Sequence, residues 1–476
     1  MEKAIAIEKD VLQSPSESKS ELGNGLQWTE EEETILRHKM DWRTVPWVTV
    51  LYLLCFLDRI NIGNARIQGM QQDLQLEGLR FNWALSIFYI VYLTVEVPSN
   101  IILKRVGPRY YLPSLVVGFG LVSMCSAFIQ SYGGLLAARA VLGVFEGGAM
   151  PGFAFYLSSF YKRKELLFRI GIYVSAASMA GAFGGLLATG LSRIPDWGGI
   201  ITMIIGLIAP IWLPGSPASC MFLTDRERMI ATERLVREHR SQPDEKVTLA
   251  HVKRAVTNIH NYTCGLGFFL INITVQGLSV FLPTILRDLD WTDTKAQLYS
   301  VPPYVCACVV AVAIAYASDK TRHRGAFLAA FSLLAIIGFA ILRWETNPNI
   351  RYMGVFFVTV GAFPGGPGFL AWAINNAAGP AVRAVTSAYV VTVGTIGGIV
   401  ATWTYIPADG PAYRTGHTIN LVGQIVVVCL SLFGIAYCSW ENKLRAAGKR
   451  DHRLEGRTQE EIDQLGYRHP EFRYIK

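Results

Sequence analysis

The sequence predicts an all-α membrane protein with twelve transmembrane helices arranged in two six-helix halves. Of its 476 residues, 51% are hydrophobic and only 17% are charged, whereas an average soluble protein has about 25% charged residues. The apolar residues fall into repeated blocks, and many of these reach the length of about 20 residues that a membrane-crossing helix needs. The net charge of +8 comes from loops and tails, so it does not indicate a nucleic-acid-binding surface.

Twelve apolar blocks are candidates for membrane spans. Many of them are rich in glycine and alanine, which let helices approach each other closely in lipid. The predicted spans are 45–64, 82–103, 111–130, 134–157, 168–190, 198–214, 262–284, 298–317, 326–343, 352–374, 384–406 and 419–440. The sixth is the shortest, since roughly 17 residues of helix reach only about 26 Å against a hydrocarbon core of about 30 Å.

Polar segments divide the chain into five parts. The first is polar and acidic without the apolar core of a signal peptide, so we expect a disordered cytosolic tail. Two bundles of six spans follow, separated by a polar loop, and a basic tail ends the chain. The parts are 1–41, 42–217, 218–258, 259–441 and 442–476.

The loops set the expected orientation. Lysine and arginine gather after even-numbered spans, for example at Lys162 to Lys164, which places both termini in the cytosol. In the central loop, Thr224 to Glu227 form a capping box before a helix that runs to about Arg240. We expect this helix to be a solvated surface element that bridges the halves, with a partner-docking helix as the alternative.

The two halves carry similar basic loops at corresponding places. Lys104 to Arg109 joins spans two and three, and Asp319 to Gly325 joins spans eight and nine. Such a six-plus-six repeat is typical of secondary transporters, and the second loop resembles the signature loop of the major facilitator superfamily. The resemblance makes Asp319, Lys320, Arg322 and Arg324 candidate gating residues. The first loop departs from the signature, with Asn100 at its leading glycine and Lys104 at its acid.

Four further motifs occur in the order found in one fungal group of that superfamily. They are Leu57 to Ala65, Arg139 to Gly148, Leu213 to Pro217, and Tyr413 to Gly416. From about residue 41 to 445 the chain resembles the fungal anion:cation symporters, the allantoate and nicotinate permease group. This resemblance implies proton-coupled transport of a small organic anion by alternating access. We expect a monomer without a cofactor in the plasma membrane, or alternatively in the vacuolar membrane.

Ionisable residues inside a membrane are costly and usually functional. The outer part of span one holds Asp58 and Arg59, and span four holds Arg139 and Glu146 seven residues apart. That spacing puts both side chains on one helix face, roughly 10 Å apart. An arginine fork suits a carboxylate substrate, and a buried carboxyl group can carry the coupled proton. The resemblance implies that Arg59 binds the anion, that Asp58 and Glu146 carry protons, and that Arg139 pairs with Glu146.

Structural roles remain open for these residues. Arg139 and Glu146 could be an ion pair that only holds helices together, and Asp58 and Arg59 could reach the outer interface. Glu96 in span two is equally compatible with a functional and a structural role.

Uncharged polar side chains complete the predicted substrate site. Tyr92 lies one turn before Glu96, although tyrosine inside a span is as often a packing residue. The second half has no charge at its midplane and offers Gln276 in span seven and Asn376 at the end of span ten.

The sequence also bears on functions other than import. The eight cysteines are scattered without a zinc or redox spacing, and we find neither a metal cluster nor a paired nucleophile and base, so we do not expect an enzyme. Export of an acidic metabolite and a non-transporting nutrient sensor remain alternatives. Relative to the family pattern, about ten residues are missing where Pro195 to Trp197 runs directly into Gly198.

Overall fold

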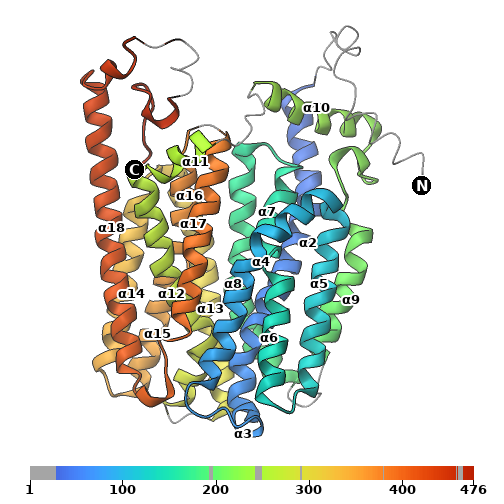
Figure 1. Cartoon of the computed structure of the whole chain (residues 1–476), viewed down its shortest axis with the longest axis vertical. Helices are drawn as coiled ribbons and strands as arrows, with labels where there is room; N and C mark the ends of the chain where they lie inside the picture. Colours follow the sequence, from blue (N-terminus) through green and yellow to red (C-terminus); the bar gives the residue numbers. More distant parts are fainter. Residues whose placement is uncertain are drawn as a thin grey trace.

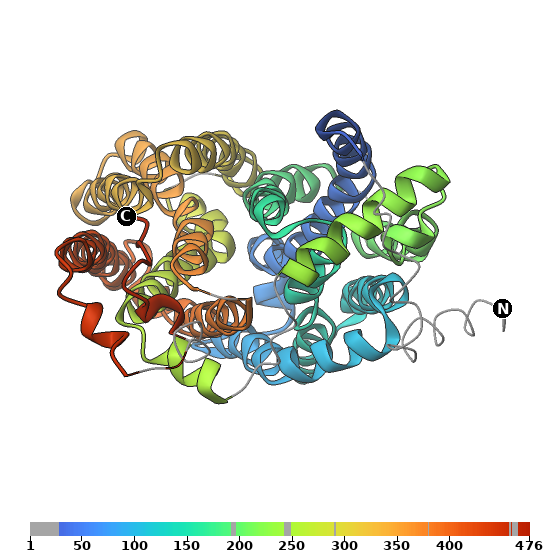
Figure 2. The same ribbon diagram turned by 90° about the horizontal axis from the view of Figure 1, so that it is seen from above.

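The computed structural model shows a bundle of long helices that run side by side along its longest axis (Figure 1). Seen along this axis, the helices form two groups (Figure 2). No strand occurs in the part of the chain that the structure describes. That part consists of residues 28–191, 197–241, 249–289, 292–378, 380–456, 458 and 465–476.

Every predicted span overlaps one helix or two consecutive helices. The first half consists of α2 (Glu30–Ala65), α4 (Arg80–Val106), α5 (Pro108–Cys125), α6 (Tyr132–Glu146), α7 (Ala149–Ser158), α8 (Arg163–Leu191) and α9 (Trp197–Trp212). The second consists of α12 (Ile259–Arg287), α13 (Asp293–Thr321), α14 (Arg324–Trp344), α15 (Pro348–Ala362), α16 (Gly365–Asn375), α17 (Pro380–Ala401) and α18 (Arg414–Ala446). Spans four and ten are each built from two helices, α6 with α7 and α15 with α16.

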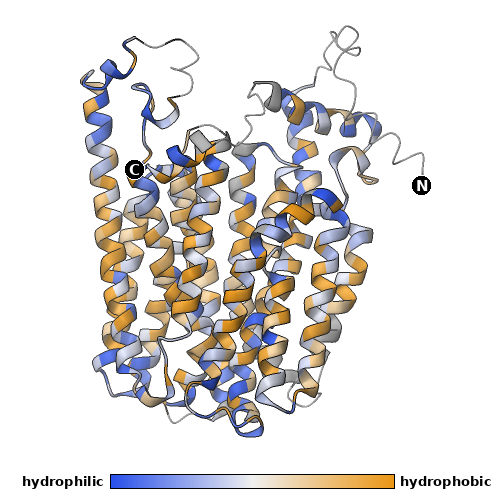
Figure 3. Cartoon of the chain, in the orientation of Figure 1, coloured by the Kyte–Doolittle hydropathy of each residue, from blue (hydrophilic) through white to orange (hydrophobic). Residues whose placement is uncertain are grey.

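The distribution of apolar residues fits a membrane protein. Hydrophobic residues predominate along the middle of the helices, and hydrophilic residues gather towards their ends (Figure 3). Eight helical segments in the described residues are each long and apolar enough to cross a membrane. Their polar backbone groups are bonded within the helices, as lipid requires.

We name the two ends of the bundle by their contents. The tail face carries α10 (Asp225–Ser241), α11 (Leu249–Val256) and residues 465–476, and the loop face carries α3 (Gln71–Asp73) and residues 402–413 (Figure 1).

The expected disordered tail ends earlier than predicted. Residues 30–41 form the first three turns of α2, because Thr29 and Glu32 make a capping box. The Glu32 amide donates to the Thr29 hydroxyl at 3.2 Å, and the Thr29 amide donates to a Glu32 carboxylate oxygen at 3.0 Å. The prediction for residues 1–27 lies outside the described residues.

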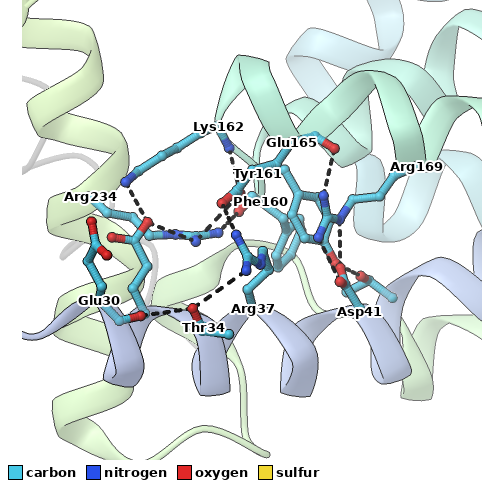
Figure 4. Close-up of polar contacts among 12 residues, drawn as sticks. Glu30, Thr34, Arg37, Asp41, Phe160, Tyr161, Lys162, Glu165, Arg169 and Arg234 are labelled. Atoms are coloured by element: carbon cyan, nitrogen blue, oxygen red, sulfur yellow. Dashed lines mark hydrogen bonds and ion pairs between the residues drawn. The ribbon is translucent and has the colours of Figure 1, made fainter. Parts of the chain in front are cut away.

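Ion pairs fasten residues 30–41, the tail-face end of α2, to the neighbouring parts of the first half and to α10 (Figure 4). Arg169 on α8 donates both to Oδ1 and to Oδ2 of Asp41 at 2.6 Å, which is the bidentate geometry of a strong pair. Glu33 accepts from Lys162. The guanidinium of Arg234 on α10 lies 3.6 Å from Glu33 and donates to the Phe160 carbonyl oxygen at 2.8 Å.

The central loop forms the predicted helix, α10, with the predicted capping box at Thr224 and Glu227. Its contacts are with the first half: Arg234 is fully buried there, and Glu227 accepts from Lys39 at 2.9 Å. The helix therefore docks on one half, in contrast to the expected solvated bridge between the two.

Span six is short, as predicted. The 16 residues of α9 reach about 24 Å. Two glycines let α9 lie against α5: a Cβ at Gly120 would lie 2.8 Å from the Met203 amide nitrogen, and a Cβ at Gly206 would lie 2.9 Å from that of Val117. Residues 192–196, at the predicted gap, lie outside the described residues.

The two halves are joined near the loop face. In the first turn of α4, Asn82 donates to the carbonyl oxygen of Thr402, the residue that directly follows α17. One turn further on, the hydroxyl groups of Ser86 and Thr402 lie 2.7 Å apart. Trp83 and Trp403 add an edge-to-face ring contact, with centroids 5.1 Å apart. We call these three contacts between α4 and α17 the loop-face lock.

Candidate functional site

A buried ion pair lies between α2 and the end of α6. The Nη2 and Nε atoms of Arg59 both donate to Oε2 of Glu146, at 2.8 and 3.1 Å. The Glu146 side chain is completely buried and that of Arg59 is 10% exposed. Arg59 and Glu146, which lie in two separate predicted motifs, are thus brought together directly.

Aromatic rings enclose the guanidinium of Arg59. Its Cζ atom lies 4.9 Å from the ring centroid of Phe56, 5.1 Å from that of Phe88 and 5.2 Å from that of Tyr92. Such cation–π contacts each stabilise a desolvated cation by up to about 2 kcal/mol. Tyr92 therefore lies at the predicted site, where its ring contacts the arginine.

Small residues on α6 make this arrangement possible. A Cβ at Gly143 would lie 2.6 Å from the Phe88 carbonyl oxygen, and a Cβ at Gly147 would lie 2.7 Å from that of Tyr92. Both distances are too short for a real side chain, so glycine is required for the close approach of α4 and α6. This approach brings the aromatic rings of α4 towards the carboxyl group of Glu146.

Arg139 is the second buried cation of this region, and it lies about two helical turns before Glu146 on α6. The residue is 8% exposed and makes neither a hydrogen bond nor an ion pair with the residues that the structure describes. The expected pair between Arg139 and Glu146 is therefore replaced by the pair between Arg59 and Glu146. A seven-residue separation is about 10 Å along a helix, which is too long for an ion pair within α6.

Two further carboxyl groups are buried in the first half. Asp58 is 5% exposed and accepts from the Ser123 hydroxyl of α5 at 3.0 Å. Glu96 is 7% exposed, and its Oε2 atom has no hydrogen-bond partner among the described residues. Asp58 thus lies next to Arg59 in sequence, but its hydrogen bond leads to a different helix.

The sequence reading missed Tyr89, which links the charged site to the second half. Its hydroxyl donates to Oε1 of Gln276 on α12 at 2.9 Å, and its ring centroid lies 6.0 Å from the guanidinium of Arg59. Only the side chain of Tyr89 therefore separates Gln276 from Arg59. The available signal was that Tyr89 and Tyr92 are three residues apart and share a helix face.

The remaining candidates lie at the tail face, away from the charged site. Asn376 is fully buried there and bonds to His260 and to Ile475. Lys320 and Arg322 are exposed at the end of α13. With the Asn375 side-chain amide turned so that its oxygen faces Arg324, this oxygen accepts from Nη2 of Arg324 at 2.9 Å and from Nε at 3.0 Å. The side chain of Asp319 lies outside the described residues.

The described residues contain no group of three or more histidine, cysteine, aspartate or glutamate side chains that could hold a metal ion.

Comparisons with known proteins agree with this architecture. The family model described as Major Facilitator Superfamily matches residues 48–402. The MFS-type transporter efuF of Hormonema carpetanum is 33% identical over 427 residues, covering 86% of each chain. The high-affinity nicotinic acid transporter of Saccharomyces cerevisiae is 30% identical over 456 residues, covering 93% of this chain and 85% of that protein.

A solved structure shares the fold. It is a bacterial homologue of the human lysosomal transporter Spinster, described as inward-facing and unoccupied. Its TM-score is 0.59 at 16% identity, and the match covers 86% of this chain and 97% of that one.

Proposed function

We propose that this chain, which belongs to the major facilitator superfamily, carries a small organic anion together with a proton by alternating access. Its family and its apolar helices make it a multi-pass membrane transporter. A carboxylate of the nicotinate type is the substrate class that we favour, because one relative is named as a nicotinic acid transporter.

The observation that carries this proposal is the unpaired guanidinium of Arg139. A cation without a partner among the described residues is costly in a membrane protein unless something compensates its charge. A carboxylate substrate can accept two parallel hydrogen bonds from an arginine fork. We therefore assign the first contact with the substrate to Arg139, and not to Arg59 as the family resemblance implies.

The pair between Arg59 and Glu146 supplies the coupling in this proposal. While Glu146 is ionised, it occupies Arg59 with two hydrogen bonds. When Glu146 takes up a proton, its charge no longer holds the guanidinium, and Arg59 becomes available to the anion. Binding of the proton and binding of the anion therefore favour each other, which is the requirement for symport.

Counting charges gives the expected stoichiometry. Asp58, Arg59, Arg139 and Glu146 together carry no net charge when all are ionised. One bound carboxylate would leave a net charge of −1 in a buried site, and an uncompensated buried charge costs several kcal/mol. One proton per anion restores neutrality. The site that holds both then carries no net charge while the protein changes from one open state to the other.

The arrangement of the halves supports alternating access. The loop-face lock closes one side of the molecule, through Asn82, Ser86 and Thr402. We infer that the tail face is cytosolic, because the basic loops gather there. The structure would then be the state that is closed to the outside, and transport would require the lock to open.

The test is uptake of radiolabelled nicotinate into proteoliposomes that contain the purified chain, with allantoate and pantothenate as further candidates. An imposed inward proton gradient should drive accumulation, and a protonophore should abolish it. Glu146→Gln should block accumulation but allow exchange of internal for external substrate, whereas Glu96→Gln serves as the matched control. Accumulation that is insensitive to the protonophore would refute the coupling, and absence of binding for every carboxylate would refute the substrate class.

A further inference from the structure

The last residues of the chain are docked into the second half at the tail face. Residues 465–476 lie over the ends of its helices, beside α18 (Figure 2). Tyr467 and Tyr474 are buried there, with 7% and 4% of their surface exposed. We call residues 465–476 the C-terminal strap.

Two asparagine side chains hold the backbone of the strap. On α18, Asn442 donates to the carbonyl oxygen of Tyr474 at 2.9 Å and accepts from its amide at 2.9 Å. At the end of α16, Asn376 donates to the carbonyl oxygen of Ile475 at 2.9 Å and accepts from its amide at 2.8 Å. Adjacent residues of an extended chain point their backbone groups in opposite directions, so the strap bridges two helices.

Side chains secure the strap on both sides of these clamps. Arg445 donates to the carbonyl oxygens of Phe472 and Tyr467 at 2.7 and 2.9 Å, and its guanidinium lies 4.8 Å from the ring centroid of Tyr474. The indole nitrogen of Trp372 donates to the Ile475 carbonyl oxygen at 2.9 Å. The strap thus supplies backbone acceptors to Arg445, Trp372 and Asn376, and each such hydrogen bond contributes about 0.5–3 kcal/mol.

The strap binds the end of a short helix, α16, that follows a proline. Phe363 and Pro364 separate α15 from α16, although both keep helical backbone angles, and proline is a common site of helix kinking. The same short helix contacts α8 of the first half. Closing the tail face requires the helix ends of the two halves to approach each other, and α16 lies where they would meet.

We propose that the C-terminal strap is a regulatory latch that ties α16 to α18 and so stabilises the state in which the loop face is closed. Release of the strap lets α16 bend towards the first half, and it shifts the protein towards the state that is open at the loop face. This inference goes beyond the proposed function and does not depend on which substrate is carried.

Hydrogen–deuterium exchange on the full-length protein in lipid nanodiscs tests the latch without a substrate. Its matched variant is a chain that ends at Thr458, which lacks the whole strap. We expect faster exchange at α16 and, across the membrane, an increase on the order of tenfold at the loop-face end of α4, the size of a typical allosteric coupling. A synthetic peptide of residues 465–476 should restore both rates, and the same peptide with Tyr474→Ala should not.

A second variant separates the clamp from general packing. Asn442→Ala in the full chain should reproduce part of the effect of truncation, but in the chain ending at Thr458 it should add nothing, because Asn442 then has no strap to hold. Faster exchange at α16 alone, with no change at the loop face, would reduce the strap to a packing element and overturn the proposal. Unchanged exchange at both places, or failure of the peptide to restore it, would also overturn it.

Discussion

Glu146→Gln is the substitution that tests the coupling mechanism most directly. Glutamine has nearly the same size as glutamate and can accept the same two hydrogen bonds from Arg59, but it carries no charge and cannot take up a proton. It therefore mimics a permanently protonated Glu146 in the buried space between α2 and α6. Arg59 keeps its aromatic neighbours, so the variant removes only the negative charge.

The magnitude follows from the two hydrogen bonds at 2.8 and 3.1 Å. A hydrogen bond to a charged group contributes about 1.5–3 kcal/mol. In the variant the donor of each bond stays charged and only the acceptor loses its charge, so we place the contribution of each bond at the lower end of this range instead of the upper end. Two such bonds therefore hold Arg59 less tightly by about 2 kcal/mol in the variant. An anion that competes for Arg59 should gain that difference, which corresponds to an affinity about 30-fold higher than that of the wild type with Glu146 ionised.

Equilibrium binding of radiolabelled nicotinate across a pH series measures this effect. In the wild type the anion binds the protonated form more tightly, so affinity should be highest at low pH and should fall by about 30-fold in total as Glu146 becomes ionised. In Glu146→Gln the affinity should stay high, with this dependence removed. A variant that binds more weakly than the wild type, or that keeps the full pH dependence, would show that Glu146 is not the coupling group.

Four other perturbations have definite expected outcomes. Arg139→Ala should weaken anion binding by about 100-fold, the loss of two charge-assisted hydrogen bonds, and Arg139→Lys should recover only part of it, as equilibrium binding will show. Arg234→Ala should lower the free energy of unfolding by about 3 kcal/mol without changing the affinity for the anion, because it leaves Glu33 less well paired; thermal unfolding in detergent measures it. Asn82→Ala should weaken the loop-face lock by about 1 kcal/mol and raise exchange at the loop-face end of α4 about fivefold. Insertion of about ten family-like residues between Trp197 and Gly198 should raise both the melting temperature and uptake, and equal values for both chains would show that the short span is tolerated.

The sequence was sufficient to predict the helices but not the partners of their charges. The lengths of apolar blocks fix where spans lie, because lipid demands about 20 residues of helix. The start of α10 was also predictable, since Thr224 and Glu227 form a local signal three residues apart. In contrast, Arg59 on α2 and Glu146 on α6 lie 87 residues apart, and their contact depends on how these two helices are placed in the bundle. No spacing within one helix contains that information.

The C-terminal strap could not be predicted for a similar reason. Residues 442–476 are basic, and we expected a cytosolic tail. Asn376 and Asn442 bind backbone groups of Tyr474 and Ile475, and backbone recognition leaves no pattern in the sequence of the bound segment. The same contact explains why Asn376 is a poor candidate for the substrate site, because its side-chain amide is already occupied.

The distribution of charge between the halves suggests how selectivity and coupling are divided. Asp58, Arg59, Arg139 and Glu146 all belong to the first half, whereas the second half reaches this site through Gln276 and its bond to Tyr89. In the proposed mechanism these charged residues bind a carboxylate and a proton. Every organic acid has a carboxylate, so the charged residues cannot distinguish one acid from another. Neutral groups such as Gln276 can do so, since an unsatisfied polar group disfavours the wrong ligand. We therefore infer that substitutions at Gln276 change which anion is preferred while leaving proton coupling intact, and that substitutions at Glu146 do the opposite.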